Sequence, residues 1–322
     1  MFRLAILDDY QDAALKLGEW ASLGADVQVE RFTDHLPDVA GLAQRLAGFD
    51  GVFLMRERTQ FPGALIEQLP KLRLILTAGM RNVAIDEAAA TKRGIQISGT
   101  SMLPYPTAEL TWGLILALAR SIPQQEAEMR AGRWQTRYGF GLRGKTLGVI
   151  GLGRLGVQVT AIGKAFGMEV IAWSQNLKPE TAAAAGATAV TKDELFERSD
   201  VITLHYVLSA RSRGMVGGGE LALMKPTAYI VNTSRGPLIH EAALLAALQK
   251  RQIAGAGIDV YDTEPVAANH PFLELDNVVL TPHLGYVTEE NLRTMYAQAV
   301  EDLRGFLDGK AVRPVNDLTA KT

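Results

Sequence analysis

Three short segments of the chain combine ionisable side chains with turn-forming residues. They are Asn232-Thr233-Ser234-Arg235-Gly236, the Glu264-Pro265 pair, and Thr281-Pro282-His283. Each follows an apolar run of the kind that forms a buried strand. An imidazole, a carboxylate and a guanidinium that come together can exchange a proton and bind an anion. Taken singly, each segment also has a structural explanation, as a surface arginine, a loop glutamate or a capping histidine.

A glycine-rich turn lies upstream of these segments. The apolar run 147–150 leads into Gly151-Leu152-Gly153-Arg154-Leu155-Gly156, which opens a helix with apolar residues at helical spacing. This is the dinucleotide fingerprint in its proper context: one glycine permits the tight turn, one admits the pyrophosphate to the backbone, and one lets the helix pack on the strand. A turn that serves packing alone is the structural alternative. We predict a cofactor site that includes the following residues: Gly151, Gly153, Arg154, Leu155 and Gly156.

The end of the next strand bears on the choice between NAD and NADP. A carboxylate about 20 residues after the turn commonly binds the adenosine ribose. Here the apolar run ends at Trp173 and Ser174-Gln175-Asn176 follows, without a carboxylate. The repulsion against a 2′-phosphate is therefore missing, while Lys178 is the only nearby cation. Both NAD and NADP remain open, with Ser174 at the adenosine end.

The elements that must position these groups alternate in type along the chain. Short apolar runs and longer amphipathic segments follow one another from residue 4 to residue 97 and again from residue 146 to residue 280, which is typical of parallel sheets with crossover helices. Among them we expect a helix over 13–23. The segment 108–120 reads as a largely buried helix, and 288–307 as an amphipathic helix that ends at Gly309.

Composition narrows the class of ligand. The 322 residues include 33 Lys and Arg against 35 Asp and Glu, without a dense basic block, which excludes the electrostatic footprint of a protein that binds nucleic acid or an anionic membrane. The chain has 0 cysteines, and its histidines lack metal-ligand spacing, so we predict no metal site. The apolar start is too short for a signal peptide and no run reaches the length of a membrane span, which predicts a cytoplasmic protein that acts on a small molecule.

Together, the glycine-rich turn and the three ionisable segments, in this order, closely resemble the D-isomer-specific 2-hydroxyacid dehydrogenases. This family includes phosphoglycerate, glycerate and D-lactate dehydrogenases and glyoxylate/hydroxypyruvate reductases. The resemblance implies an α/β protein with two doubly wound parallel-sheet domains, in which a Rossmann cofactor domain is inserted into a flavodoxin-like substrate domain. We place the NAD(P)-binding domain at 101–286 and the substrate domain at 1–100 and 287–322.

The resemblance also implies that Arg235, Glu264 and His283 are the catalytic set. Their chemistry suits the reduction of a 2-oxo acid, which needs a hydride at the carbonyl carbon and a proton at its oxygen. We assign the proton to His283 because histidine delivers protons near neutral pH. Glu264 beside it would favour the charged imidazole and fix the ring. Arg235 offers the substrate a rigid donor fork, which a lysine does not. By the same resemblance, four more residues contact the cofactor: Thr107, Thr233, Ser234 and Asp259, the last at the nicotinamide amide.

The first domain is expected to bind the substrate's carboxylate. The family uses the backbone amides of a glycine-rich loop for this, and Gly79, Met80 and Arg81 occupy the corresponding positions after a strand. The loop departs from the family pattern, because Arg81 and Val83 stand where a second glycine and then an aspartate are common. Arg81 could itself bind an anion. Arg56 matches a family position near the substrate, although a solvated surface cation is an equal alternative.

Two further expectations concern partners and alternatives. Trp134, Tyr138 and Phe140 lie in a segment that forms a dimer contact in the family, so we favour a homodimer over local packing of these rings. Some relatives are NAD(H)-responsive corepressors, and a non-catalytic sensor is therefore the alternative function. Related formate enzymes carry glutamine in place of the carboxylate at Glu264, which argues against formate as substrate.

Overall fold

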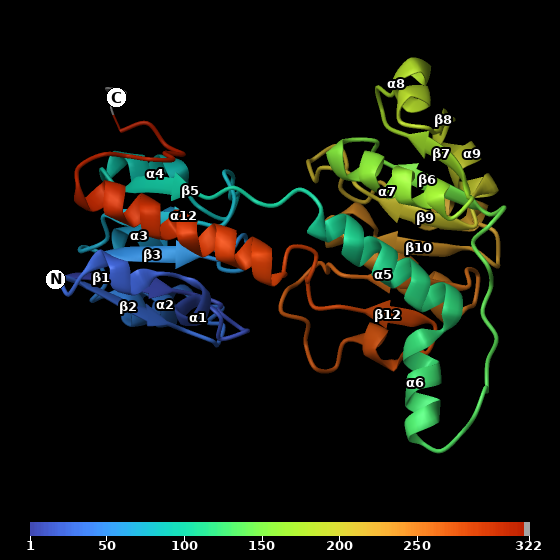
Figure 1. Cartoon of the computed structure of the whole chain (residues 1–322), viewed down its shortest axis with the longest axis horizontal. Helices are drawn as coiled ribbons and strands as arrows, with labels where there is room; N and C mark the ends of the chain where they lie inside the picture. The colour runs from blue at the N-terminus through green and yellow to red at the C-terminus, as the bar shows by residue number, and fades with distance from the viewer. Residues whose placement is uncertain (319–322) are drawn as a thin grey trace. The chain divides into compact units, whose positions relative to one another are not determined.

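The computed structural model describes residues 1–318, which form two compact units (Figure 1). Unit 1 comprises Met1–Leu103 and Val287–Thr322, and unit 2 comprises Pro104–Tyr286. Unit 2 is thus inserted into the sequence of unit 1. Each unit is built around its own parallel sheet, and each is described separately below.

Unit 1 contains a five-stranded parallel sheet in the order β2-β1-β3-β4-β5. Adjacent strands run parallel because each one is followed by a helical or looped crossover. Its elements are β1 (Phe2–Ile6), α1 (Ala14–Leu17), the 3-10 helix η1 (Trp20–Leu23), β2 (Val27–Arg31), α2 (Val39–Leu46), β3 (Gly51–Leu54), α3 (Gly63–Glu67), β4 (Leu74–Thr77), α4 (Glu87–Lys92), β5 (Gln96–Gly99) and α12 (Glu289–Leu307).

Both faces of this sheet are covered, as Figure 1 shows. Ala5, Val52 and Ile75 belong to the core that includes residues of α2, α3 and α4. Alternate strand residues point to the opposite face, where Phe53 packs against Tyr296 of α12 with ring centroids 5.6 Å apart. Parallel strands buried on both faces explain the nearly continuous apolar runs in this part of the sequence.

One expected helix is interrupted. The prediction of a helix over 13–23 is wrong, because α1 ends at Leu17 and Gly18 adopts an extended conformation before η1. The indole Nε1 of Trp20 donates to the carbonyl oxygen of Ala14 at 2.8 Å, and a β-carbon on Gly18 would lie 2.2 Å from that same Nε1. The tryptophan thus folds back over the glycine and ends the helix. The helix expected at 288–307 is confirmed as α12, with Thr288 as its cap.

Unit 2 contains a seven-stranded sheet in the order β12-β11-β10-β9-β6-β7-β8. The order reverses beside β6, as in a Rossmann sheet, and ligands of such sheets bind at this switch point. Its elements are α5 (Pro106–Arg120), α6 (Ile122–Arg130), β6 (Thr146–Ile150), α7 (Arg154–Ala165), β7 (Glu169–Trp173), α8 (Pro179–Ala184), β8 (Thr188–Ala189), α9 (Lys192–Arg198), β9 (Val201–Leu204), α10 (Gly218–Leu223), β10 (Tyr229–Asn232), the 3-10 helix η2 (Gly236–Leu238), α11 (Glu241–Gln249), β11 (Gly255–Ile258), the 3-10 helix η3 (Pro271–Glu274) and β12 (Val278–Leu280).

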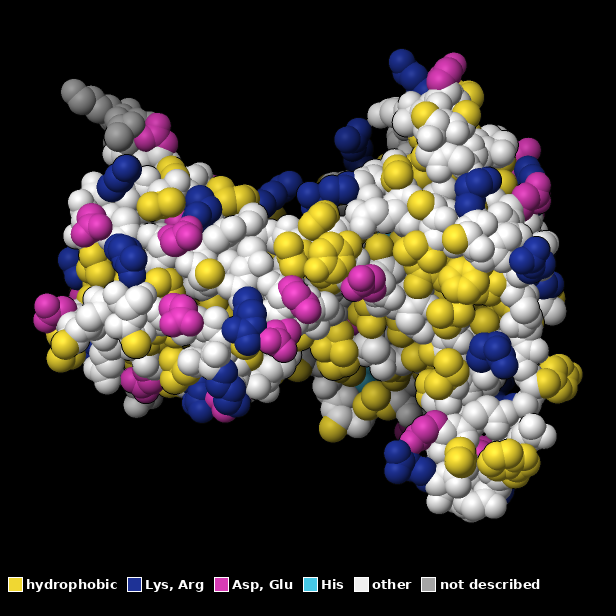
Figure 2. Space-filling view, in the orientation of Figure 1, with side chains coloured by type: hydrophobic (Ala, Val, Ile, Leu, Met, Phe, Trp, Pro, Cys, Tyr) yellow, Lys and Arg dark blue, Asp and Glu magenta, His cyan; other side chains and the backbone are white. Residues whose placement is uncertain are grey.

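Two separate apolar cores lie on the two faces of this sheet. Leu147 and Val149 of β6 pack in the core that holds α5 and α7, whereas Ile150 belongs to the core under α9, α10 and α11. The predicted α/β class with two parallel sheets is therefore confirmed. Over residues 1–318, no helix is long and apolar enough to cross a bilayer. Basic and acidic side chains are interspersed on the face shown in Figure 2.

Candidate active site

The imidazole of His283 and the carboxylate of Glu264 form a close pair in unit 2. His283 Nδ1 lies 2.6 Å from Glu264 Oε2, and the two side chains are 20% and 28% exposed. Glu264 Oε1 accepts a second hydrogen bond, from the backbone N–H of Tyr261 at 2.9 Å. The carboxylate is thus fixed at both oxygens and holds the ring by Nδ1, which leaves Nε2 as the nitrogen available to a ligand.

Electrostatics favour the ionised form of this carboxylate. Burial on its own would raise the pKa of Glu264. The hydrogen bond and charge of His283, the Tyr261 N–H and the charge of Arg235 together outweigh burial and hold the pKa below its usual range. Glu264 therefore stays negative at neutral pH and can stabilise a positive charge on the neighbouring imidazole.

The backbone around His283 is held by Asp259. His283 has a φ of 55°, in the left-handed region that is uncommon for residues other than glycine. Its N–H donates to the carbonyl oxygen of Asp259 at 2.8 Å. The buried carboxylate of Asp259 accepts from the hydroxyl of Thr281 at 2.6 Å and from the amides of Leu284 and Gly285 at 2.7 and 3.0 Å. Asp259 therefore shapes the loop that carries the histidine, and its contact with a nicotinamide amide stays a prediction.

Arg235 follows the end of β10 in the same unit. Its carbonyl oxygen accepts from the side-chain amide of Asn232 at 2.9 Å, and its own Nη1 donates to the carbonyl oxygen of Ser234 at 2.7 Å. The residue is half-buried, and its charge acts on Glu264. All three predicted catalytic residues thus follow strands of one sheet, at the carboxyl end where parallel sheets bind ligands.

The glycine-rich turn lies at the carboxyl end of β6. Gly151 has a φ of 94°, and a β-carbon there would lie 2.3 Å from the carbonyl oxygen of His205. A β-carbon on Gly156 would lie 2.1 Å from the carbonyl oxygen of Gly151, so this glycine is needed for packing. Gly153 differs, because a β-carbon there would meet nothing within 4 Å. The backbone at Gly153 therefore faces open space at the first turn of α7, as a pyrophosphate-binding turn requires.

The remaining predicted cofactor residues surround this edge of the sheet. Arg154 and Leu155 begin α7, where Arg154 is exposed and Leu155 half-buried. The hydroxyl of Ser174 accepts from the amide of Leu152 at 3.2 Å, which connects the end of β7 with the glycine turn. The hydroxyl of Ser234 donates to the carbonyl oxygen of Tyr206 at 2.7 Å.

Thr107 and Thr233 connect helix α5 with the catalytic loops. Thr107 donates through its hydroxyl to the carbonyl oxygen of Gly285 at 2.8 Å. Thr107 is not the cap of this helix, because α5 begins at Pro106 and Tyr105 occupies the cap position. Thr233 pairs its hydroxyl with that of Thr111 at 2.8 Å. The start of α5 is thus tied to the loop after β12 and to the end of β10.

His205 is a half-buried histidine outside this set. Its Nε2 lies 3.0 Å from the hydroxyl of Thr203, and its buried Nδ1 has no partner among residues 1–318. Burial lowers the pKa of His205 to about 4, so the ring is neutral at physiological pH. A neutral ring with one unpaired nitrogen suits a structural role near the glycine turn better than a role in proton transfer.

In unit 1, the predicted substrate loop follows β4. Gly79 has a φ of 95°, and a β-carbon there would lie 2.3 Å from Nη1 of Arg56. Arg56 Nη1 also lies 3.4 Å from the carbonyl oxygen of Ala78, to which it donates. The positive φ therefore favours glycine at position 79, and the structure brings Arg56 and the Gly79 loop together.

Asn82 holds these two loops in place. Its side-chain amide donates to the carbonyl oxygen of Arg56 at 2.7 Å and to the hydroxyl of Thr77 at 3.0 Å, while its oxygen accepts from the amide of Ala84 at 3.0 Å. The side chain is buried. Arg56 needs such support because its φ of 57° is unfavourable for a residue with a β-carbon. Asn82 thus positions the arginine.

The buried carboxylate of Asp8 supports the same loop from the neighbouring strand. Its Oδ2 accepts from the hydroxyl of Thr59 at 2.5 Å, and its Oδ1 lies 2.9 Å from Nδ1 of His35. Its carbonyl oxygen accepts from Nη1 of Arg58 at 2.8 Å. The turn after β3 is therefore fastened on both sides, by Asp8 at the end of β1 and by Asn82 after β4.

The tip of the Gly79 loop has unsatisfied hydrogen-bond donors. The amide of Gly79 donates to the hydroxyl of Thr100 at 3.2 Å. Within residues 1–318, the amides of Met80 and Arg81 have no acceptor. Exposed amides at the carboxyl end of a parallel strand, beside an arginine, form a site that suits a carboxylate.

Comparison with known proteins connects these features. Residues 112–285 match the sequence profile described as D-isomer specific 2-hydroxyacid dehydrogenase, NAD binding domain. The chain belongs to this family. It is 40% identical over 256 residues to the glyoxylate reductase of Aeropyrum pernix, which covers 76% of each chain. It is 41% identical to the D-3-phosphoglycerate dehydrogenase of Methanocaldococcus jannaschii over 82% of this chain and 51% of that protein.

A solved structure is similar over almost the whole chain. The phosphoglycerate oxidoreductase of Vibrio cholerae superposes with a TM-score of 0.92 at 35% identity, covering 96% of this chain and 100% of that one. The similarity to 2-hydroxyacid dehydrogenases predicted from the motifs is therefore confirmed. So is the prediction of a nicotinamide cofactor, because the matched profile is the NAD-binding domain of the family.

The positioning roles of several residues were not predicted from the sequence. Asn82, Asp8 and Thr281 hold the loops that carry Arg56 and His283. Asn82 and Thr281 stand inside the motifs that were singled out, so their polar side chains were a usable signal. Asp8 lacked such a signal, because its partner Thr59 is remote in the sequence and meets it only through the pairing of β1 with β3.

Proposed function

We propose that this protein is an NAD(P)-dependent oxidoreductase that interconverts a small D-2-hydroxy acid and its 2-oxo acid. The observation that carries the proposal is the 2.6 Å pair between His283 Nδ1 and Glu264 Oε2, in the same unit as the glycine-rich turn. Proton transfer at a carbonyl oxygen needs a side chain that can give and take a proton, and imidazole is a common side chain for this role in enzymes.

The roles of the three side chains follow from their chemistry. During reduction, His283 Nε2 gives its proton to the carbonyl oxygen of the 2-oxo acid, while the carbonyl carbon receives a hydride and the C=O bond becomes a C–OH bond. A nicotinamide dinucleotide held at Gly151, Gly153 and Gly156 would supply that hydride. During oxidation, neutral His283 takes the hydroxyl proton. Glu264 stabilises the charged imidazole in both directions.

Substrate binding is assigned to arginine and to backbone amides. Arg235 presents a planar fork that can bind the carboxylate and the carbonyl oxygen, and this polarises the carbonyl as negative charge develops. The amides of Met80 and Arg81, with Arg56 against Gly79, are proposed to bind the substrate carboxylate, which makes unit 1 the substrate domain. Glyoxylate and phosphoglycerate are proposed as substrate classes, because relatives of this chain are named glyoxylate reductase and D-3-phosphoglycerate dehydrogenase.

The test is a panel of 2-oxo acids with each reduced cofactor. NADH or NADPH oxidation would be followed with glyoxylate, hydroxypyruvate, pyruvate, 2-oxoglutarate and phosphohydroxypyruvate. Turnover of at least one acid, with a D-2-hydroxy acid as product, is expected. A chain that binds NADH but reduces none of them would instead support the non-catalytic sensor.

We also propose a cytoplasmic homodimer that associates through the segment 122–141. The support is apolar surface, because Met129 is 64%, Trp134 75% and Tyr138 97% exposed. Phe140 differs, since it is half-buried and stacks on Tyr229 with centroids 5.2 Å apart. Exposed aromatic side chains in one segment are typical of protein interfaces. The molar mass in solution tests the assembly.

A further inference from the structure

The loop after β4 carries an arginine side chain, that of Arg81, which is not needed to bind a single substrate carboxylate. Under the proposed function, the amides of Met80 and Arg81 and the guanidinium of Arg56 bind the substrate carboxylate. Arg56 is partly balanced by Glu57, whose Oε1 lies 3.6 Å from its Nη2. The Arg81 side chain is exposed, and among residues 1–318 it has no ion pair, hydrogen bond or ring contact. Its positive charge is therefore uncompensated.

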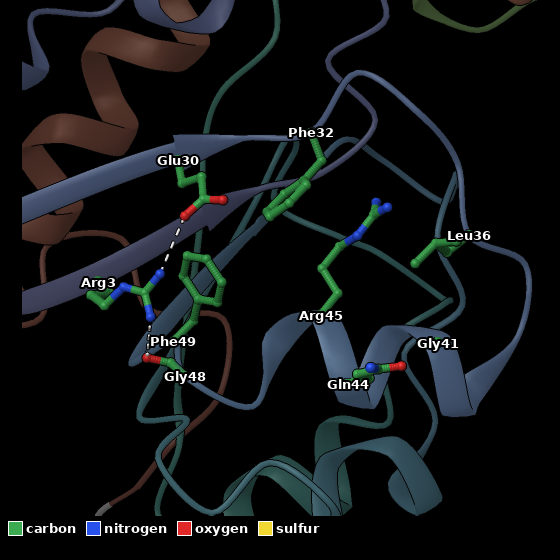
Figure 3. A pocket seen from close by; sticks show the side chains of 9 residues that line it. All are labelled: Arg3, Glu30, Phe32, Leu36, Gly41, Gln44, Arg45, Gly48 and Phe49. Carbon is green, nitrogen blue, oxygen red and sulfur yellow. Dashed lines mark hydrogen bonds and ion pairs between the residues drawn. The ribbon is translucent and has the colours of Figure 1, made fainter.

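Other arginines of unit 1 differ from Arg81 because their guanidinium groups have partners within the fold. A groove of about 610 Å³ lies beside β2 and α2. Two of these arginines, Arg3 and Arg45, line it (Figure 3). Arg3 pairs with Glu30 at 3.2 Å and lies 4.4 Å from the ring centroid of Phe49. Arg45 lies 4.5 Å from the ring centroid of Phe32 and is also paired with a carboxylate. Both guanidiniums are used within the fold, whereas that of Arg81 is not.

The residues beside Arg81 add a second observation. Met80 is 49% exposed and Val83 is 71% exposed, so two exposed apolar residues lie close to Arg81 in the sequence of the loop. A loop at the end of a strand that presents apolar and cationic side chains, together with amides that have no acceptor within the described residues, can contact a ligand through all three. The loop thus offers a ligand a site for one carboxylate and, next to it, a further positive charge.

We infer that Arg81 determines specificity by binding a second anionic group at the far end of the substrate. The preferred substrates are then 2-oxo acids that carry a carboxylate or a phosphate monoester beyond C2. A guanidinium binds either group through charge-assisted, bidentate hydrogen bonds. The inference rests on the proposed function, and it adds the substrate class that this chain selects.

The experiment compares acids that differ in the second anion. Hydroxypyruvate and glyoxylate have one negative group, oxaloacetate adds a second carboxylate, and phosphohydroxypyruvate adds a phosphate. The kcat/KM of each would be measured for the wild type, Arg81→Gln and Arg81→Lys. Lys71→Gln is the matched control, because Lys71 is exposed, precedes the same strand at its opposite end and loses the same charge.

We expect Arg81→Gln to lower kcat/KM for the favoured dianionic acid by about 10- to 100-fold, the range for a lost hydrogen bond to a charged group. Because the backbone amide of residue 81 remains, kcat/KM for the monoanionic acids should fall clearly less than kcat/KM for the dianionic acid. Arg81→Lys should retain part of the preference, and Lys71→Gln should leave every value unchanged. Whether oxaloacetate or phosphohydroxypyruvate responds identifies the second anion as carboxylate or phosphate.

Two results would overturn the inference. One is an equal fall for monoanionic and dianionic acids in Arg81→Gln, and the other is no change for either. In both cases the wild type still reduces 2-oxo acids, so the proposed function survives. A wild type that reduces monoanionic acids but neither dianionic acid would likewise overturn the inference alone, whereas a wild type that reduces none of these acids and none of the panel above would remove the proposed function itself.

Discussion

The carboxyl edges of the two sheets end in different kinds of group. In unit 2, the ionisable side chains are paired with each other, as His283 is with Glu264 at 2.6 Å. In unit 1, the corresponding edge presents arginines and unsatisfied backbone amides around Gly79. Paired acid and base groups exchange protons, whereas cations and amides bind anions. Under the proposed function, unit 2 transfers the proton and polarises the carbonyl, while unit 1 adds binding of the substrate carboxylate, so variants of the two edges should change different kinetic constants.

Among the variants that leave the imidazole of His283 in place, the largest effect is expected for Glu264→Gln. The substitution keeps the shape but removes the charge that stabilises the imidazolium, so kcat should fall by about 100-fold, the lower end of the contribution of acid–base catalysis. NADH affinity, measured by fluorescence titration, should stay unchanged. A normal kcat in this variant would show that the charge of Glu264 is not needed.

The pH dependence of wild-type turnover also tests the role of Glu264. Its pKa is held below the usual range, so the carboxylate is ionised at neutral pH and loses its charge only when the pH falls through that lowered value. Turnover of the wild type should therefore not decline through protonation of Glu264 between neutral pH and the ordinary carboxyl range. A decline that is present in the wild type and absent in Glu264→Gln would contradict this assignment.

Asn82→Ala should weaken substrate binding at the sheet edge of unit 1. Without the amide that supports the carbonyl oxygen of Arg56, the arginine loses its fixed position, and KM for the 2-oxo acid should rise by about tenfold while kcat changes little. Thermal unfolding would confirm that the variant is folded. A fall in kcat with an unchanged KM would mean that the division between the edges is wrong.

Ser174→Asp should have the smallest effect, confined to cofactor choice. A carboxylate after β7 would repel a 2′-phosphate, so Kd for NADPH should rise about fivefold, as expected for one like-charge contact in partly solvated surroundings. Kd for NADH should not rise. If neither value changes, the adenosine end of the cofactor lies elsewhere.

Short sequence patterns predicted the parts of the structure that depend on residues close together in the sequence. The turn at Gly151, Gly153 and Gly156 was predictable because the glycine spacing, with an apolar strand before it and an amphipathic helix after it, is a pattern of neighbouring residues. The order of Arg235, Glu264 and His283 after apolar runs also indicated strand ends of one sheet. The short strand β8 was not predicted, because two residues are too few to show the alternation that indicates a strand.

Contacts between remote segments account for what was missed. The helix expected over 13–23 is broken because Trp20 folds over Gly18, a preference that spacing alone does not reveal. The bond from Asn82 to Arg56 and the bond from Thr59 to Asp8 each join loops that follow different strands. Such partners become visible only once the strand order is known, because it decides which loops are neighbours.

The most direct test of the central claim is turnover in His283→Ala beside its affinity for NADH. If His283 supplies the proton, kcat for 2-oxo acid reduction should fall by about 1,000-fold, within the range of acid–base catalysis, while Kd for NADH stays within about twofold of the wild type. A variant that keeps near-normal turnover would contradict the assignment of the proton to this imidazole.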